Sequence, residues 1–231
     1  DRLGDLNHRI LDLIGRSLDD RLHGLPASAG WWNDPELQSV KRELAGMLAG
    51  LSGEGRPWGV YDPRISRLLP LWQDAFESTG LRPIYVWAVR DPREACRDLV
   101  AEGVAETLPF ADLIWFTYNA DVIKFADNEI AATIDHGGWG GDAARLAEQL
   151  LDILPSRWRG SHAELIECAR AQDLPQASAE RTDGPLPLSS ELYRTIRNVS
   201  ADLDGGRRAA IVSALDLLRG MLTPFADRIR H

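Results

Sequence analysis

The 231-residue sequence predicts an α/β fold, with a three-layer arrangement in which helices flank a parallel sheet on both sides. Two observations support this prediction. Short apolar runs that are typical of strands alternate along the chain with amphipathic helical stretches. In addition, the run over residues 84–89 is apolar at every position, as is typical of a strand covered on both faces. We predict one domain over residues 1–231, because chains of this length commonly form a single domain.

Apolar residues at helical spacing, separated by proline and glycine residues, define the predicted helices. These helices cover residues 3–18, 34–48, 66–78, 90–103, 109–125, 191–198 and 207–225. Asp34 and Pro35 illustrate how such a helix begins, because an N-capping aspartate followed by proline is typical of a first helical turn. Residues 156–231 are predicted to be a helix-rich C-terminal extension of the same domain, interrupted by a polar loop over residues 175–187.

The predicted strands cover residues 58–61, 84–89 and 130–134. Three strands are few for a parallel sheet of this class. Either the sequence hides further strands, or the sheet begins upstream of Asp1, and we favour the second explanation. The absence of an initial methionine supports it.

Composition and charge exclude several classes of function. A net charge of −9 and an isoelectric point near 5.1 argue against a nucleic-acid-binding protein, which needs a basic surface. No apolar run reaches the roughly 18 residues of a membrane helix, which excludes a spanning segment. No signal peptide is visible, and the two cysteines are expected to be buried free thiols, so we expect a cytoplasmic protein. Cys96 and Cys168 do not form a disulfide framework, and the spacing of the histidines predicts no metal site.

Arg90 follows the strand over residues 84–89 and precedes Asp91 and Pro92, which begin the next helix. Ligands of open parallel sheets bind beyond the carboxyl ends of the strands, where helix N-termini attract anions. A forked arginine in this position can therefore hold a phosphate. A salt bridge between Arg90 and a neighbouring carboxylate, which would close the sheet edge, explains the residue equally well.

The segment Tyr61-Asp62-Pro63-Arg64 repeats this order of strand, acid, proline and arginine. Here we favour a structural role. Asp62 would cap the following helix, and Arg64 would form a salt bridge with it.

A third strand end carries Asp135 and His136, followed by a glycine-rich stretch over residues 137–141. Four glycines in this stretch would let a backbone approach a phosphate, which allows a nucleotide-dependent enzyme as a weaker hypothesis. The stretch lacks the Lys-Ser/Thr of a Walker loop and the spacing of a dinucleotide fingerprint. A flexible connection capped by Asp142 is therefore the simpler interpretation.

Several segments follow one another in a characteristic order between residues 6 and 154. They are Leu-Asn-His-Arg-Ile-Leu at 6–11, Trp58 with Asp-Pro-Arg at 62–64, Leu-Leu-Pro-Leu-Trp at 68–72, Arg-Asp-Pro-Arg-Glu at 90–94, Trp115 with Tyr-Asn at 118–119, and Ile-Asp at 134–135. In this order the chain resembles the bacterial sulfotransferase family. Members of that family have a P-loop-type α/β fold and use 3′-phosphoadenylyl sulfate (PAPS) as donor.

The resemblance implies a reaction: transfer of a sulfuryl group from PAPS to a hydroxyl or amine of a small-molecule, glycan or lipid acceptor, without a metal. The alternative is a catalytically inactive module of the same fold that binds a ligand or a partner. The family's glycine-rich loop for the 5′-phosphosulfate lies upstream of the Leu-Asn segment, which would place it before Asp1. We favour that explanation over a degenerate relative that has lost donor binding.

The resemblance also assigns roles to individual positions. Arg90 would contact the 3′-phosphate of the donor, and in the family a serine eight residues later completes this contact. Here that position is Asp98, whose charge repels a phosphate. The family usually has lysine before Asp-Pro-Arg, near the transferred group, where this chain has Tyr61. Asp135 and His136 are candidates for the general base on their strand-end position alone.

Overall fold

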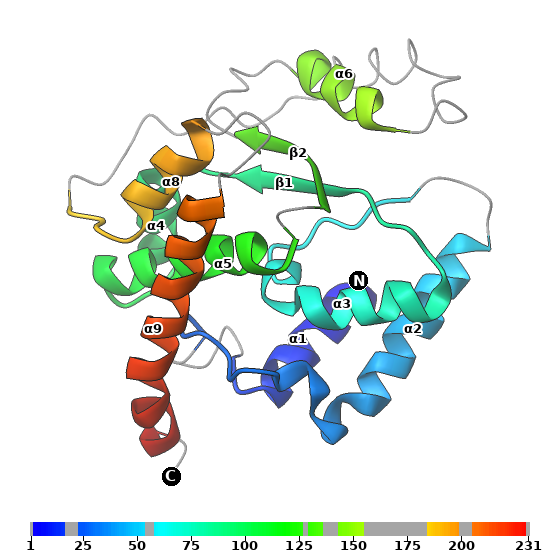
Figure 1. Ribbon diagram of the computed structural model, residues 1–231, viewed down its shortest axis with the longest axis horizontal. Helices are drawn as coiled ribbons and strands as arrows, with labels where there is room; N and C mark the ends of the chain where they lie inside the picture. The colour runs from blue at the N-terminus through cyan, green and yellow to red at the C-terminus, as the bar shows by residue number, and fades with distance from the viewer. Residues whose placement is uncertain are drawn as a thin grey trace.

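The computed structural model describes residues 2–16, 23–53, 58–126, 129–135, 143–154, 184–198 and 205–229 (Figure 1). In chain order the elements are α1 (Arg2–Leu13), η1 (Trp31–Asn33), η2 (Pro35–Leu37), α2 (Gln38–Ser52), α3 (Ile65–Thr79), β1 (Tyr85–Val89), α4 (Pro92–Ala101), α5 (Leu108–Ala126), β2 (Ile130–Asp135), α6 (Ala143–Ile153), α8 (Ser189–Asn198) and α9 (Gly205–Ile229). The predicted α/β class is confirmed, and the described part is mostly helical. None of the helices in these ranges is long and apolar enough to cross a membrane.

β1 and β2 form a parallel sheet, as the alternation of strands and helices predicts. Val89 at the end of β1 pairs with Asp135 at the end of β2, so both strands end at the same edge. Within the described residues the sheet has two strands, and the strand predicted over residues 58–61 is wrong. Trp58 and Val60 instead pack, partly buried, against the helices α1, α2 and α3.

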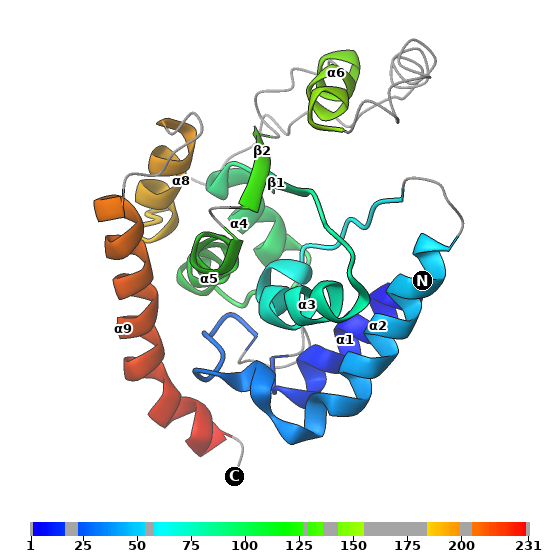
Figure 2. The ribbon, with the colours of Figure 1, turned by 45° about the vertical axis from the view of Figure 1, so that its right-hand side comes forward.

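β1 is covered less completely than its apolar sequence predicts. Trp87 and Val89 are buried against α5, whereas Val86 and Ala88 on the alternate face are exposed. The prediction that both faces of this strand are covered is therefore wrong. Figures 1 and 2 show α5 on one side of the sheet and α6 on the other, and α6 contacts β2.

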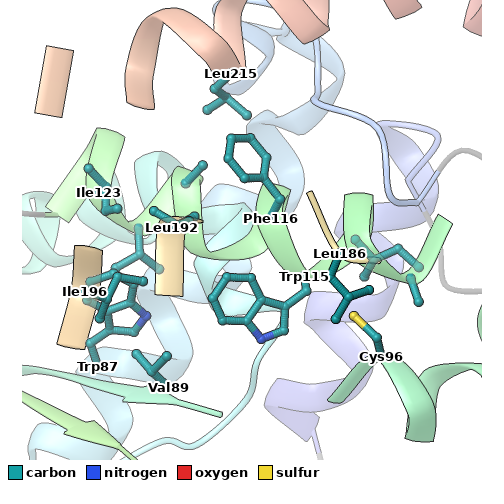
Figure 3. Close-up of a cluster of buried hydrophobic side chains, with 14 of the residues drawn as sticks. Trp87, Val89, Cys96, Trp115, Phe116, Ile123, Leu186, Leu192, Ile196 and Leu215 are labelled. Carbon is teal, nitrogen blue, oxygen red and sulfur yellow. The ribbon is translucent and has the colours of Figure 1, made fainter. Parts of the chain in front are cut away.

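The buried apolar residues form two clusters. One cluster lies among α1, α2 and α3 and is centred on the fully buried Trp72. The other joins β1, α4, α5, α8 and α9, with Trp115 and Phe116 of α5 in its middle (Figure 3). Figure 2 shows α1, α2 and α3 together on one side of the molecule and α9 on the opposite side. The helices predicted over residues 191–198 and 207–225 are confirmed, while residues 155–183 of the predicted extension lie outside the described residues.

A buried ion pair joins the two clusters where α3 packs against α5. Arg67 Nη1 of α3 donates to Asp121 Oδ2 of α5 at 2.6 Å, and Arg67 Nη2 donates to the carbonyl oxygen of Leu25 at 2.6 Å. The guanidinium also lies over the ring of Tyr118, 5.4 Å from its centre. Since a buried charge needs a partner, these contacts fix how the two helices meet.

Candidate functional site

The carboxyl edge of the sheet brings together the residues that follow β1 and β2. Asp91 follows β1 by two residues and caps α4, because its Oδ1 accepts a hydrogen bond from the backbone N–H of Arg93 at 2.8 Å. Pro92 occupies the first turn, which removes a backbone donor that would have no partner there. The predicted start of this helix is confirmed, and it places Arg90 at the edge of the sheet.

Arg90 and Asp98 lie together, although eight positions separate them in the sequence. Arg90 Nη2 forms an ion pair with Asp98 Oδ2, and Arg97 Nη2 forms a second ion pair with Asp98 Oδ1. Burial raises the pKa of Asp98, but the hydrogen bonds from Arg90 and Arg97 outweigh burial and hold that pKa below its usual value. Asp98 is therefore a carboxylate at neutral pH, and the salt bridge that the sequence allowed for Arg90 is present.

The guanidinium groups of Arg90 and Arg97 both pair with the carboxylate of Asp98. Arg90 Nε is buried and has no hydrogen-bond partner among the described residues, and an unsatisfied buried donor is unusual in a folded protein. Trp115 holds the backbone here, because its Nε1 donates to the Arg90 carbonyl oxygen at 3.0 Å. Asp98, in contrast, does not fit a bound phosphate, since its charge opposes the ligand.

Beside this cluster, a cavity of about 480 Å³ lies between the start of α4 and one face of α8. Its lining includes Asp91, Arg93, Ser190, Tyr193, Arg194 and Arg197. The four α8 residues follow one another at positions i, i+3, i+4 and i+7, which places them on one helix face. Sequence reasoning missed this cavity, because about a hundred residues separate the α4 part of the wall from the α8 part. The spacing on α8 indicates a shared helix face but does not specify the element that this face meets.

Asp135 ties the end of β2 to α8. Its Oδ1 accepts a hydrogen bond from the Tyr193 hydroxyl at 3.0 Å, and its Oδ2 forms an ion pair with Arg197 Nε at 3.1 Å. Burial and the neighbouring Asp135 carboxylate raise the pKa of Tyr193 far above its usual value, so this hydroxyl keeps its proton. Asp135 thus lies at the predicted edge with both oxygens engaged. His136, residues 137–141 and Asp142 lie outside the described residues.

The segment around Asp62 lies just before α3 and forms a separate polar group with residues of α1 and α3. Asp62 accepts hydrogen bonds from Arg64 Nε and Nη2, each at 2.8 Å, and from Asn7 Nδ2 at 2.8 Å. Asn7 in turn accepts a hydrogen bond from Trp72 Nε1 at 3.0 Å. Burial raises the pKa of Asp62, but the bonds from Arg64 and Asn7 outweigh it, so the pKa lies below its usual value. The predicted pairing of Asp62 with Arg64 is present, and Tyr61 is 85% exposed.

Asn7 lies in the Leu-Asn segment at 6–11, but the sequence assigned it no role of its own. It is fully buried on α1, and its side-chain amide connects the Asp62 segment with the first hydrophobic cluster. A polar residue within an apolar helical stripe was the signal in the sequence.

Within the described ranges, no group of three or more histidine, cysteine, aspartate or glutamate side chains is arranged to hold a metal ion. Comparisons of the chain with protein-family models, with curated proteins and with solved structures found no match.

Proposed function

We propose that the protein transfers a sulfuryl group from PAPS to a hydroxyl or amine of a small-molecule, glycan or lipid acceptor. One observation carries the proposal. Arg90 and position 98 meet at the carboxyl end of β1, where the resemblance to bacterial sulfotransferases requires a site for the 3′-phosphate of the donor. In this proposal, β1 and β2 belong to the three-layer parallel sheet of a single P-loop-type domain.

The donor brings an activated sulfuryl group, and transfer is an in-line displacement. A new bond forms between the acceptor oxygen or nitrogen and sulfur, the bond from sulfur to the 5′-phosphate oxygen breaks, and the acceptor's proton passes to a base. The part of this chain is to bind and position the reactants. Arg90 holds the 3′-phosphate, and Trp115 fixes the backbone of Arg90. Asp135 and His136 are the candidates for the base by their position after β2.

Binding of the product nucleotide tests this assignment. Adenosine 3′,5′-bisphosphate should raise the melting temperature of the wild-type protein, and Arg90→Ala should remove this effect. Asp98→Ser removes a negative charge from the phosphate site and should tighten nucleotide binding by about fivefold or more, since two like charges a few ångströms apart repel by at least ~1 kcal/mol. Arg42→Ala is the matched control, because Arg42 is an exposed arginine of α2. Equal melting shifts in the wild type and in Arg90→Ala would refute the site.

A catalytically inactive binding module is the second candidate function. The observations that favour it are the ion pair of Arg90 with Asp98 and the exposed Tyr61 in the place of the family's lysine. This alternative predicts no transfer of labelled sulfate from PAPS to any acceptor and no melting shift with the nucleotide. Nucleotide binding that appears only in Asp98→Ser would indicate that the wild-type site no longer binds PAPS.

A further inference from the structure

The cavity between α4 and α8 is separate from the Arg90 site, since neither Arg90 nor Asp98 is among its lining residues. Three arginines, Arg93, Arg194 and Arg197, contribute to its wall. Arginine is the side chain best suited to phosphate and sulfate groups, because its planar fork donates two parallel hydrogen bonds to them.

Arg197 is held in place and yet keeps donors for a ligand. Its Nε pairs with Asp135, and its guanidinium lies over the ring of Tyr193, 5.7 Å from the centre. Tyr193 is itself fixed by its hydrogen bond to Asp135 and by an edge-on contact with Trp115. Among the described residues, the two Nη atoms of Arg197 have no hydrogen-bond partner. These contacts restrain Arg197, although its side chain is 60% exposed, and so reduce the conformational freedom that it loses when a ligand binds.

The other two arginines differ in how far they are engaged. Arg194 forms an ion pair with Glu191, one turn earlier on α8, and both side chains are largely exposed. Arg93 is exposed, and its side chain makes no ion pair or hydrogen bond with the described residues. Both guanidinium groups can therefore turn toward a ligand at little cost, since exposed ion pairs contribute little to stability.

Three carboxylates lie near this donor set. Asp91 is the acid in the wall, and its Oδ1 is directed at the backbone N–H of Arg93 in the first turn of α4. A capping carboxylate is partly neutralised by the positive end of the helix dipole. Asp135 and Glu191 contact Arg197 and Arg194 without themselves being among the lining residues. The wall therefore presents three guanidinium groups and one capped carboxylate, and two of the three guanidinium groups are also paired with a carboxylate outside the lining.

From these contacts we infer that the cavity binds a phosphate or sulfate ester of a small organic molecule, with Arg93, Arg194 and Arg197 as its donors. The volume indicates the organic part. A cavity of about 480 Å³ has the size of a small-molecule site, and a phosphate or sulfate ion alone occupies a small part of it. This inference does not depend on sulfuryl transfer, because it rests on residues other than Arg90.

Calorimetric titration at low ionic strength tests the site with three probes: inorganic phosphate, glucose 6-phosphate and adenosine 3′,5′-bisphosphate. We expect at least one of the two organic phosphates to bind more tightly than inorganic phosphate. Arg93→Ala and Arg194→Ala should each weaken that binding by roughly tenfold or more, since each removes a charge-assisted hydrogen-bond donor to the phosphate. Both side chains are exposed, so neither variant should fail to fold.

The variants separate this site from the proposed donor site. A sugar phosphate that binds Arg90→Ala as tightly as the wild type, but Arg93→Ala more weakly, supports the cavity whether or not the protein transfers sulfuryl groups. Nucleotide binding that Arg93→Ala weakens supports the cavity as a nucleotide site. The inference is overturned if neither organic phosphate binds, if inorganic phosphate binds as tightly as both, or if Arg93→Ala binds them like the wild type. Arg42→Ala, on the remote α2, should change none of these affinities.

Discussion

Replacing Asp121 by alanine leaves the buried guanidinium of Arg67 without its charged partner. The two side chains are 6% and 1% exposed, and their ion pair measures 2.6 Å. Arg67 cannot turn toward water without also breaking its hydrogen bond to Leu25. Removing one partner of a buried pair typically costs about 3–5 kcal/mol, so we expect Asp121→Ala to lower the free energy of unfolding by roughly 4 kcal/mol. For a chain of this size, that corresponds to a fall in melting temperature of about 8–16 °C.

Urea unfolding followed by tryptophan fluorescence measures this loss, and circular dichroism measures the change in melting temperature. Two variants serve as controls. Arg67→Met combined with Asp121→Leu removes both charges and should recover most of the stability. Glu43→Ala breaks the exposed pair with Arg9 and should cost less than about 1 kcal/mol. The reasoning fails if Asp121→Ala lowers the free energy of unfolding no more than Glu43→Ala does. It also fails if the double variant loses as much stability as the single variants Arg67→Met and Asp121→Leu lose when added together.

Two further predictions concern acid stability and backbone packing. Burial raises the pKa of Asp62, but the hydrogen bonds that Arg64 donates outweigh burial and hold this pKa below its usual value. The contribution of the ionised Asp62 to the free energy of unfolding is therefore present above pH 3.8 and is lost as the pH falls through the lowered pKa. In Asp62→Asn, the free energy of unfolding should depend less on pH in this acid range, as measured by urea unfolding at a series of pH values. An unchanged pH dependence would contradict the assignment. Gly46→Ala on the exposed side of α2 should stabilise the protein by up to about 1 kcal/mol in urea unfolding. Gly24→Ala should instead destabilise it by about 1–3 kcal/mol, because the added Cβ would lie 2.7 Å from Ile114 Cγ1, and equal effects at both glycines would refute this contrast.

Local sequence patterns predicted most of the helices and the parallel pair of strands, because these elements depend on spacing within one segment. The capped start of α4 at Asp91 and Pro92 is an example, since the signal lies within a few residues. The strand predicted over residues 58–61 shows the limit. Trp58 and Val60 are apolar as expected, but their packing partners are helices rather than strands. A short apolar run does not specify which kind of element it packs against.

The candidate site was predicted in part for the same reason. The edge position of Arg90 and Asp135 follows from the alternation of strands and helices, and the pairing of Val89 with Asp135 agrees with it. The role of α8 could not be predicted, since the contacts of Tyr193 and Arg197 with Asp135 join segments about sixty residues apart. Such contacts arise from packing between distant elements, which no local pattern specifies.

The exposed face of β1 has a practical consequence for handling the protein in solution. Val86 is 38% exposed, Ala88 is exposed beside it, and the strand Tyr-Val-Trp-Ala-Val contains no charged residue or proline that would discourage contact with other strands. Concentrated samples should therefore begin to aggregate at this strand. Val86→Thr is the mildest remedy, because threonine keeps the branched Cβ that favours a strand and adds a hydroxyl on the side that faces water.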